Sequence, residues 1–288
     1  MLSLIWSGVV TGCLYALGAL GLVMIYKSSK VVNFSHGNLA GLSAFCVFGL
    51  TAGSLSWPWW FAVAVATVVA LAVALLTWAL LLPIVSRSDL TATIATVGVG
   101  LILQGTVLVF FGSDIVSLDL PIPQMSVKAL GINVTSYDVT VVLSTLLLVG
   151  LLFIIVDGTR IGVAFRATAS NPFASRVCGL SINRIHLFSW ATGALLGVAS
   201  ALLIVPTTFL SPTAIESFMI QAFAAAVLGG FSSLPGTIIG GILVGILVNL
   251  FIYYVSSEFT NTFLLALILI ALPLFPEGIL SRRERTRA

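Results

Sequence analysis

Nine long apolar stretches, separated by charged or Pro- and Gly-rich breaks, run through almost the whole sequence. They lie near residues 4–26, 37–53, 58–82, 90–111, 138–156, 186–205, 217–231, 236–254 and 261–275. A helix needs about 20 mostly apolar residues to cross the hydrocarbon core of a membrane. Charged residues make up only 7% of this chain, whereas a soluble domain carries about 25%. We therefore predict an all-α polytopic membrane protein with about eight or nine transmembrane helices.

Three of these stretches, 37–53, 217–231 and 261–275, are short or interrupted by Gly and Pro. Irregular backbone is tolerated inside a membrane only where protein or a water-filled cavity covers it. We expect short or broken helices there. Spacings of the form Gly-x-x-x-Gly, which let helices approach closely in lipid, predict that the helices pack into one compact bundle. These pairs are Gly8/Gly12, Gly37/Gly41, Gly193/Gly197, Gly236/Gly240 and Gly241/Gly245.

The positions of Lys and Arg predict the orientation of the chain, because cytoplasmic loops are enriched in both. When the loop with Lys27 and Lys30 is placed in the cytoplasm, every basic residue of the 12 except Lys128 falls on the cytoplasmic side. That side then includes the loop 157–185 and the basic tail 277–288. We predict an N-terminus outside the cell and a cytoplasmic C-terminus.

Several classes of protein are disfavoured by what the sequence lacks. The low charge excludes a nucleic-acid binder, and three cysteines without C-x-x-C spacing give no zinc site. No Walker A loop, G-x-S-x-G or H-E-x-x-H motif is present, and no acidic residue lies in the middle of a stretch. We predict no catalytic, metal-binding or cofactor-binding residues, and we expect ATP to be bound by partner subunits if it drives transport. Coupling to sodium remains an alternative.

Neutral polar residues in or beside the apolar stretches are candidates for lining the pathway of a polar solute. Hydrogen bonds between helices are the alternative role for each of them, and the start of a helix is the alternative for the first group. The candidates are Asn33, Ser35, His36 and Gly37 after the first stretch, Gln104 and Gln221 in later stretches, and Gly229 and Gly230 in an uncharged turn.

The loop 157–185 is longer than a simple connection between two helices. Asn171 is typical of an N-cap, Pro172 of a first helical position and Gly179 of a C-terminal stop, so a helix of about two turns is predicted between them. Helices this short are unstable alone. We expect this one to lie in the groove of a partner protein or, alternatively, on the anionic surface of the membrane.

The sequence resembles the branched-chain amino acid ATP-binding-cassette (ABC) transporter permeases, the LivH-like membrane subunits, over almost its full length. The similar motifs are Tyr15-Ala16-Leu17, Gly21-Leu22, Asn33-Phe34-Ser35-His36-Gly37, Thr159-Arg160-Ile161-Gly162, Arg166-Ala167, Asn171-Pro172, Ala174, Gly179 and Val227-Leu228-Gly229-Gly230. The resemblance implies one transmembrane permease domain over residues 1–288 in a bacterial inner membrane. It would move branched-chain or other neutral amino acids by alternating access, or alternatively urea or short amides.

The resemblance also implies partners. They are a second, LivM-like permease, two cytoplasmic ATPase subunits and an external solute-binding protein, besides membrane lipid, and they include no nucleic acid. The external loop 112–137 would help to dock the binding protein. The loop 157–185 would couple to the ATPases through Arg160, Arg166, Asn171, Pro172, Phe173, Arg176 and Gly179.

Overall fold

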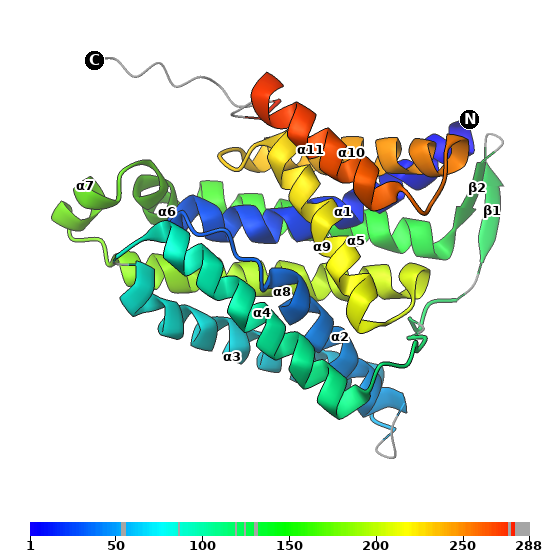
Figure 1. Cartoon of the computed structure of the whole chain (residues 1–288), viewed down its shortest axis with the longest axis horizontal. Coiled ribbons are helices and arrows are strands. Elements are labelled where there is room, and N and C mark those ends of the chain that lie inside the picture. The colour runs from blue at the N-terminus through cyan, green and yellow to red at the C-terminus, as the bar shows by residue number, and fades with distance from the viewer. Residues whose placement is uncertain are drawn as a thin grey trace.

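A computed structural model of the 288-residue chain shows a bundle of helices with one small hairpin (Figure 1). It describes residues 1–52, 56–85, 87–118, 120–123, 125–129, 132–275 and 278–279. Residues 277 and 280–288 of the predicted basic tail therefore lie outside the described residues. The helices are α1 (Leu2–Ser29), α2 (His36–Ala52), α3 (Trp59–Val85), α4 (Asp89–Phe111), α5 (Ser136–Gly158), α6 (Arg160–Ser170), α7 (Pro172–Val177), α8 (Ile182–Thr208), α9 (Pro212–Gly229), α10 (Leu234–Tyr254) and α11 (Thr260–Leu274).

The prediction of an all-α polytopic membrane protein is confirmed. Among the residues that the structure describes, six helices are long and apolar enough to cross a membrane: α1, α3, α4, α5, α8 and α10. The other three apolar stretches form the shorter helices α2, α9 and α11, which are the three that the sequence predicts to be short or interrupted. Each of the nine apolar stretches is thus helical, and the helices differ in whether their length suffices for a full crossing.

Two helices form the centre of the bundle. Of the 18 residues in an apolar segment of α1, 89% are buried, and the corresponding share for α8 is 72%. For α3, α4 and α5 this share is only 22–28%. The exposed side chains of α3, α4 and α5 are mostly large and aliphatic. Such a surface is compatible with lipid rather than with water, so these helices form much of the outer wall.

The most extensive contact between two helices in the bundle is between α1 and α10, and glycine makes it possible. A Cβ atom on Gly8 would lie 2.7 Å from the Cα of Ile246, and one on Gly12 would lie 2.6 Å from the Cα of Ile242. Small residues allow this approach, as expected for helices that associate in lipid. Polar contacts reinforce it, because the side-chain amide of Asn249 donates to Ser7 Oγ at 3.1 Å and to Thr11 Oγ1 at 3.3 Å.

The segment expected as the external loop 112–137 contains a hairpin that the sequence analysis did not predict. Strands β1 (Ser126–Ala129) and β2 (Ile132–Thr135) pair in antiparallel fashion, and α5 begins directly after them. Thr135 and Asp138 form a capping box at the start of α5. The hairpin and the N-terminus of the chain lie at one end of the bundle, and α6 and α7 lie at the other (Figure 1).

Candidate functional site

The chain reverses direction after α1 and enters α2 part-way along the bundle (Figure 1). Lys30 ends α1 in a left-handed conformation with φ of 59°. The irregular segment that follows reaches the level of Gly100 on α4, because a Cβ atom on Gly100 would lie 3.4 Å from the Cα of Ser35. Gly100 is eleven residues into α4, which corresponds to a depth of about 16 Å at about 1.5 Å per residue. The start of α2 therefore lies about halfway through a hydrocarbon core of about 30 Å.

Side chains of α4 and of the segment itself satisfy the backbone of this reversal. The backbone N–H groups of Val32 and Phe34 donate to Thr93 Oγ1 at 3.3 Å and to Thr96 Oγ1 at 3.0 Å. Asn33 Oδ1 accepts from both the backbone N–H and the hydroxyl of Ser35, at 3.1 and 2.6 Å. Backbone groups inside a membrane need such partners, since no water is present to replace them.

His36, the first residue of α2, lies between the two central helices. Its ring is only 2% exposed. A Cβ atom on Gly21 of α1 would lie 2.6 Å from its Nε2, and one on Gly197 of α8 would lie 3.0 Å from its Cε1. The backbone of Gly18 lies near the ring, but neither ring nitrogen forms a hydrogen bond with any described residue.

The structure brings together only part of the predicted pathway set. Asn33, Ser35, His36 and Gly37 form one cluster, and Gly37 packs against Met219 of α9. Gln221 is two residues from Met219 and therefore points to a different side of α9. Gly229 ends α9 and packs against the backbone of Gly236 and Thr237, and Gly230 begins the turn to α10 with a φ of 91°.

Asn38 is a polar residue of this region that the candidate set did not include. A Cβ atom on Gly100 would lie 2.9 Å from its Nδ2. Gln104 follows Gly100 by one helical turn and so lies on the same side of α4. Both side chains are half-buried, and neither amide forms a hydrogen bond within the described part of the chain. The sequence signal was present, because Asn38 continues the polar run that begins at Asn33.

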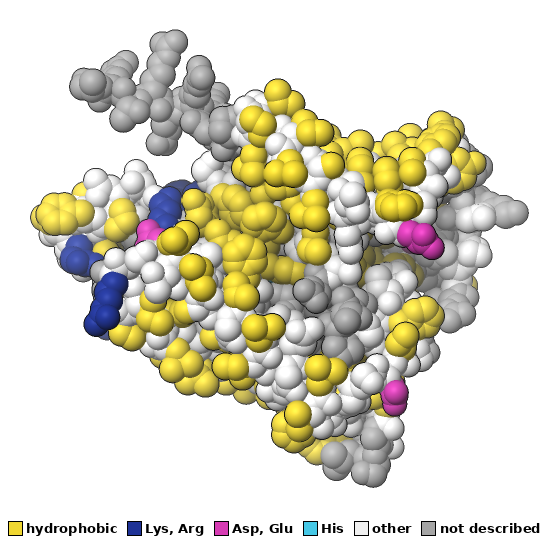
Figure 2. Space-filling view, viewed as in Figure 1, with side chains coloured by type: hydrophobic (Ala, Val, Ile, Leu, Met, Phe, Trp, Pro, Cys, Tyr) yellow, Lys and Arg dark blue, Asp and Glu magenta, His cyan; other side chains and the backbone are white. Residues whose placement is uncertain are grey.

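At the opposite end from the hairpin, α6 and α7 form a compact basic unit. Arg166 of α6 forms an ion pair with Asp157 at 2.6 Å and also donates to the carbonyl of Val156, so it joins α6 to the end of α5. Gly162 allows the tight turn between these helices, since a Cβ atom there would overlap the carbonyl oxygens of Ile155 and Val156. Basic side chains gather at this end of the molecule (Figure 2).

Helix α7 has the local structure that the sequence predicts. Asn171 Oδ1 accepts from the backbone N–H of Ala174 at 3.0 Å, Pro172 is in the first turn, and Gly179 follows the helix with φ of 82°. Ser175 is buried against the bundle, whereas Phe173 is 77% exposed and Val177 is 74% exposed. Arg176 lies in the last turn and Arg160 begins α6. An exposed aromatic and a β-branched side chain on a short helix form a small apolar surface bordered by positive charge.

No cluster of His, Cys, Asp or Glu that could hold a metal ion occurs among the residues that the structure describes. The two sites of interest are thus the start of α2 with the facing side of α4, halfway through the bundle, and the α6–α7 unit at its basic end.

Comparison with known proteins gives a consistent result. The sequence profile of the family described as "Branched-chain amino acid transport system / permease component" matches residues 4–272. The probable branched-chain amino acid transport permease protein LivH of Methanocaldococcus jannaschii is 31% identical, covering 90% of this chain and 83% of that protein. The high-affinity branched-chain amino acid transport system permease protein LivH of Escherichia coli K12 is 29% identical, covering 97% and 95%. The ribose import permease protein RbsC of the same organism is 27% identical, covering 81% and 73%.

Proposed function

The chain belongs to the family of branched-chain amino acid transport system permease components, and we propose that it is the membrane subunit of an ATP-driven importer of branched-chain or other neutral amino acids. The names of the relatives at 29–31% identity support this cargo. ATP hydrolysis is assigned to partner subunits, because the chain has no Walker A loop. A ribose permease is also similar to this chain, so similar permeases carry different cargoes. This supports the proposal that the cargo is selected largely by another subunit.

The observation that carries the proposal is the start of α2 halfway through the bundle, bordered by the amides of Asn38 and Gln104. Transfer of an unpaired amide into hydrocarbon costs about 4–8 kcal/mol. This side of α2 and α4 is therefore unsuited to contact lipid acyl chains. We assign it to the wall of the translocation pathway, which a second, similar permease closes from the other side. The start of α2 behind this wall is then shaped by Asn33, Ser35, His36 and Gly37. Three further residues, on α9 and in the turn that follows it, remain proposed pathway residues: Gln221, Gly229 and Gly230.

Leucine at Asn38 or Gln104 is expected to slow uptake about tenfold without reducing the amount of folded protein. The variant lacks the amide that contacts the solute or its water. Loss of one such hydrogen-bonding group in a buried setting costs about 1–3 kcal/mol of interaction free energy. Uptake of radiolabelled leucine into vesicles that contain the whole importer measures this effect.

Thr106→Val is the matched control, because the Thr106 hydroxyl donates to the carbonyl of Ile102 within α4 itself. It should leave uptake unchanged. Uptake at the wild-type rate in both amide variants would contradict the assignment of this wall.

We further propose that α6 and α7 lie in the cytoplasm and the N-terminus lies outside. The basic residues at the α6–α7 end support this orientation through the positive-inside rule. Phe173 and Val177 would then contact the ATPase, with Arg160 and Arg176 beside them, while Arg166, Asn171, Pro172 and Gly179 hold α6 and α7 in shape. The hairpin end would face the external solute-binding protein. Movement of the α6–α7 unit on ATP binding would switch access to the pathway between the two sides of the inner membrane.

Cys178 provides a direct test of this orientation. It is the exposed member of the three cysteines, whereas Cys13 is buried and Cys46 is partly buried. A membrane-impermeant maleimide is expected to label the protein in inside-out vesicles stripped of peripheral proteins and not in right-side-out spheroplasts. Cys178→Ser should remove the labelling, and labelling of spheroplasts at Cys178 would reverse the proposed orientation.

A further inference from the structure

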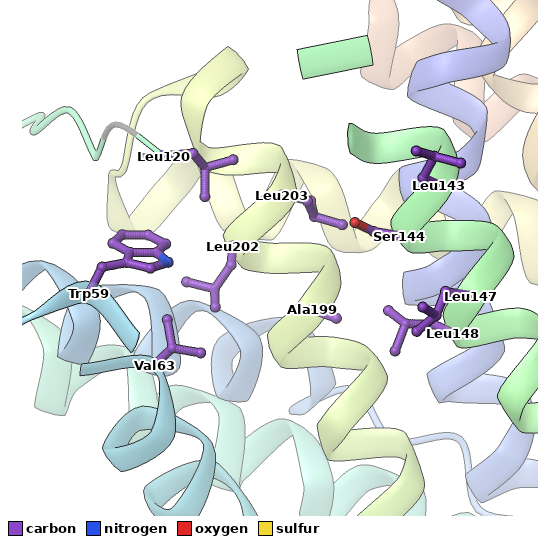
Figure 3. A pocket seen from close by; sticks show the side chains of 10 residues that line it. All are labelled: Trp59, Val63, Leu120, Leu143, Ser144, Leu147, Leu148, Ala199, Leu202 and Leu203. Atoms are coloured by element: carbon purple, nitrogen blue, oxygen red, sulfur yellow. The ribbon is translucent and has the colours of Figure 1, made fainter. Parts of the chain in front are cut away.

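An apolar groove of about 430 Å³ opens between α3, α5 and α8 (Figure 3). The side chains point into it from three helices and one loop residue. They are Trp59 and Val63 of α3, Leu143, Ser144, Leu147 and Leu148 of α5, Ala199, Leu202 and Leu203 of α8, and Leu120. No lining residue belongs to α4 or α9, so the groove is separate from the sites described above.

The lining residues lie at the depth of one leaflet. Leu143 and Leu148 are seven and twelve residues from the start of α5, which corresponds to about 10–18 Å at about 1.5 Å per residue. Ala199 and Leu203 are nine and five residues from the end of α8, or about 8–14 Å by the same rise. Half of a hydrocarbon core of about 30 Å is about 15 Å. The groove therefore occupies the half of the membrane next to the hairpin end.

The rim of the groove has the composition of a lipid-facing surface. Trp59 begins α3, and in the sequence it lies between Trp57 and Trp60. The ring of Phe61 contacts the rings of both Trp57 and Trp60. Tryptophan is enriched where membrane meets water, which places the outer end of the groove at the headgroups. The neighbouring exposed side chains of α5 include Leu146, Leu151 and Ile154, which are large, whereas helices that meet in lipid use small residues.

Two other occupants fit the groove poorly. A free amino acid would bring an ammonium and a carboxylate group, and no lining side chain is charged. A partner helix in lipid would approach closely through small side chains, whereas the α5 side of the groove presents Leu143, Leu147 and Leu148.

We propose that this groove is a binding site for one acyl chain of a membrane phospholipid. The chain enters from the headgroup level beside Trp59 and lies along Leu202 and Leu203 of α8, with α3 and α5 on its two sides. The bound chain would lie between α3, which packs on α8, and α5, which packs on α1. It would supply the van der Waals contacts that the side chains lining the groove otherwise lack.

The test uses the complete importer in vesicles of phosphatidylcholine that contain a fraction of the same lipid with bromine on its acyl chain. Bromine quenches nearby tryptophan, and the signal of Trp59 is isolated as the difference between wild type and Trp59→Phe. A site predicts quenching that saturates at a low fraction of brominated lipid. Ala199→Phe, which fills the groove, should reduce this quenching at least twofold, whereas Ile154→Phe on the outer face of α5 should not change it.

Native mass spectrometry gives a second readout. One phospholipid for each copy of this chain is expected to stay bound in wild type and in Ile154→Phe, and to be lost in Ala199→Phe. Quenching that rises in proportion to the brominated fraction in wild type would identify general contact with surrounding lipid and overturn the proposal, even if Ala199→Phe did not fold. Equal lipid retention in folded Ala199→Phe and wild type would overturn it as well.

Discussion

Valine in place of Gly12 is expected to leave almost no folded protein in the membrane. The new side chain would begin 2.6 Å from the Cα of Ile242 and 2.9 Å from the carbonyl oxygen of Gly241, so it meets backbone rather than a movable side chain. Overpacking of a core costs about 1–3 kcal/mol when side chains can adjust. Here α1 and α10 must separate as a whole, and the contact of Asn249 with Ser7 is lost with them, so the cost should lie at or above the upper end of that range.

The measurement is the yield and thermal stability of the detergent-solubilised protein, followed by size-exclusion chromatography. Gly241→Val should behave in the same way, because a Cβ atom there would lie 2.6 Å from the Cβ of Ala16. Gly150→Val is the matched control, since a Cβ atom on Gly150 meets nothing within 4 Å and valine is no worse than glycine within a helix. A wild-type yield and melting temperature for Gly12→Val would contradict the packing of α1 on α10.

Aspartate in place of Phe173 is expected to reduce ATP-driven uptake at least 30-fold while the protein stays folded. Phe173 is 77% exposed, so its loss removes little packing within this chain. An aromatic side chain at the centre of a contact between proteins contributes about 2 kcal/mol or more to binding. A carboxylate in the same place would leave a buried charge without a partner.

Uptake, the stimulation of ATPase activity by the solute-loaded binding protein, and copurification of the ATPase subunits measure this effect together. Phe173→Leu keeps an apolar side chain on α7 and should retain most of the uptake. Normal uptake in Phe173→Asp would remove α7 from the coupling contact and leave the fold unaffected.

Local rules predict much of this fold because they concern neighbouring residues. The apolar runs locate the helices, and their interruptions identify α2, α9 and α11 as the short ones. The pair Asn171-Pro172 predicts the start of α7, because an N-cap and a first-turn proline act within four residues. The hairpin of β1 and β2 was not predicted, because strands of only four residues each give too short a pattern to be recognised, although both alternate polar and apolar residues.

The candidate site depends on contacts between distant parts of the chain, which a single sequence does not specify. Asn33 and Ser35 stand out as polar residues at a membrane boundary, but their position beside Thr93 and Thr96 comes from the packing of α2 on α4. The sequence likewise gives no indication that the ring of His36 lies between Gly21 and Gly197. Gly229 and Gly230 illustrate the same limit, because glycine serves equally in a pathway wall and in a tight turn, and their contacts are those of a turn.

The reversal after α1 has a mechanical consequence. The hydroxyls of Thr93 and Thr96 on α4 accept hydrogen bonds from the backbone of Val32 and Phe34. Unless these bonds break, a tilt of α4 relative to α1 must also move the first turn of α2. Helix α4 and the first turn of α2 should therefore move together as one rigid body. The hinge of this movement would be Lys30, which ends α1 in a left-handed conformation. A motion started at the basic end of the protein would then reach mid-membrane without any helix having to unwind.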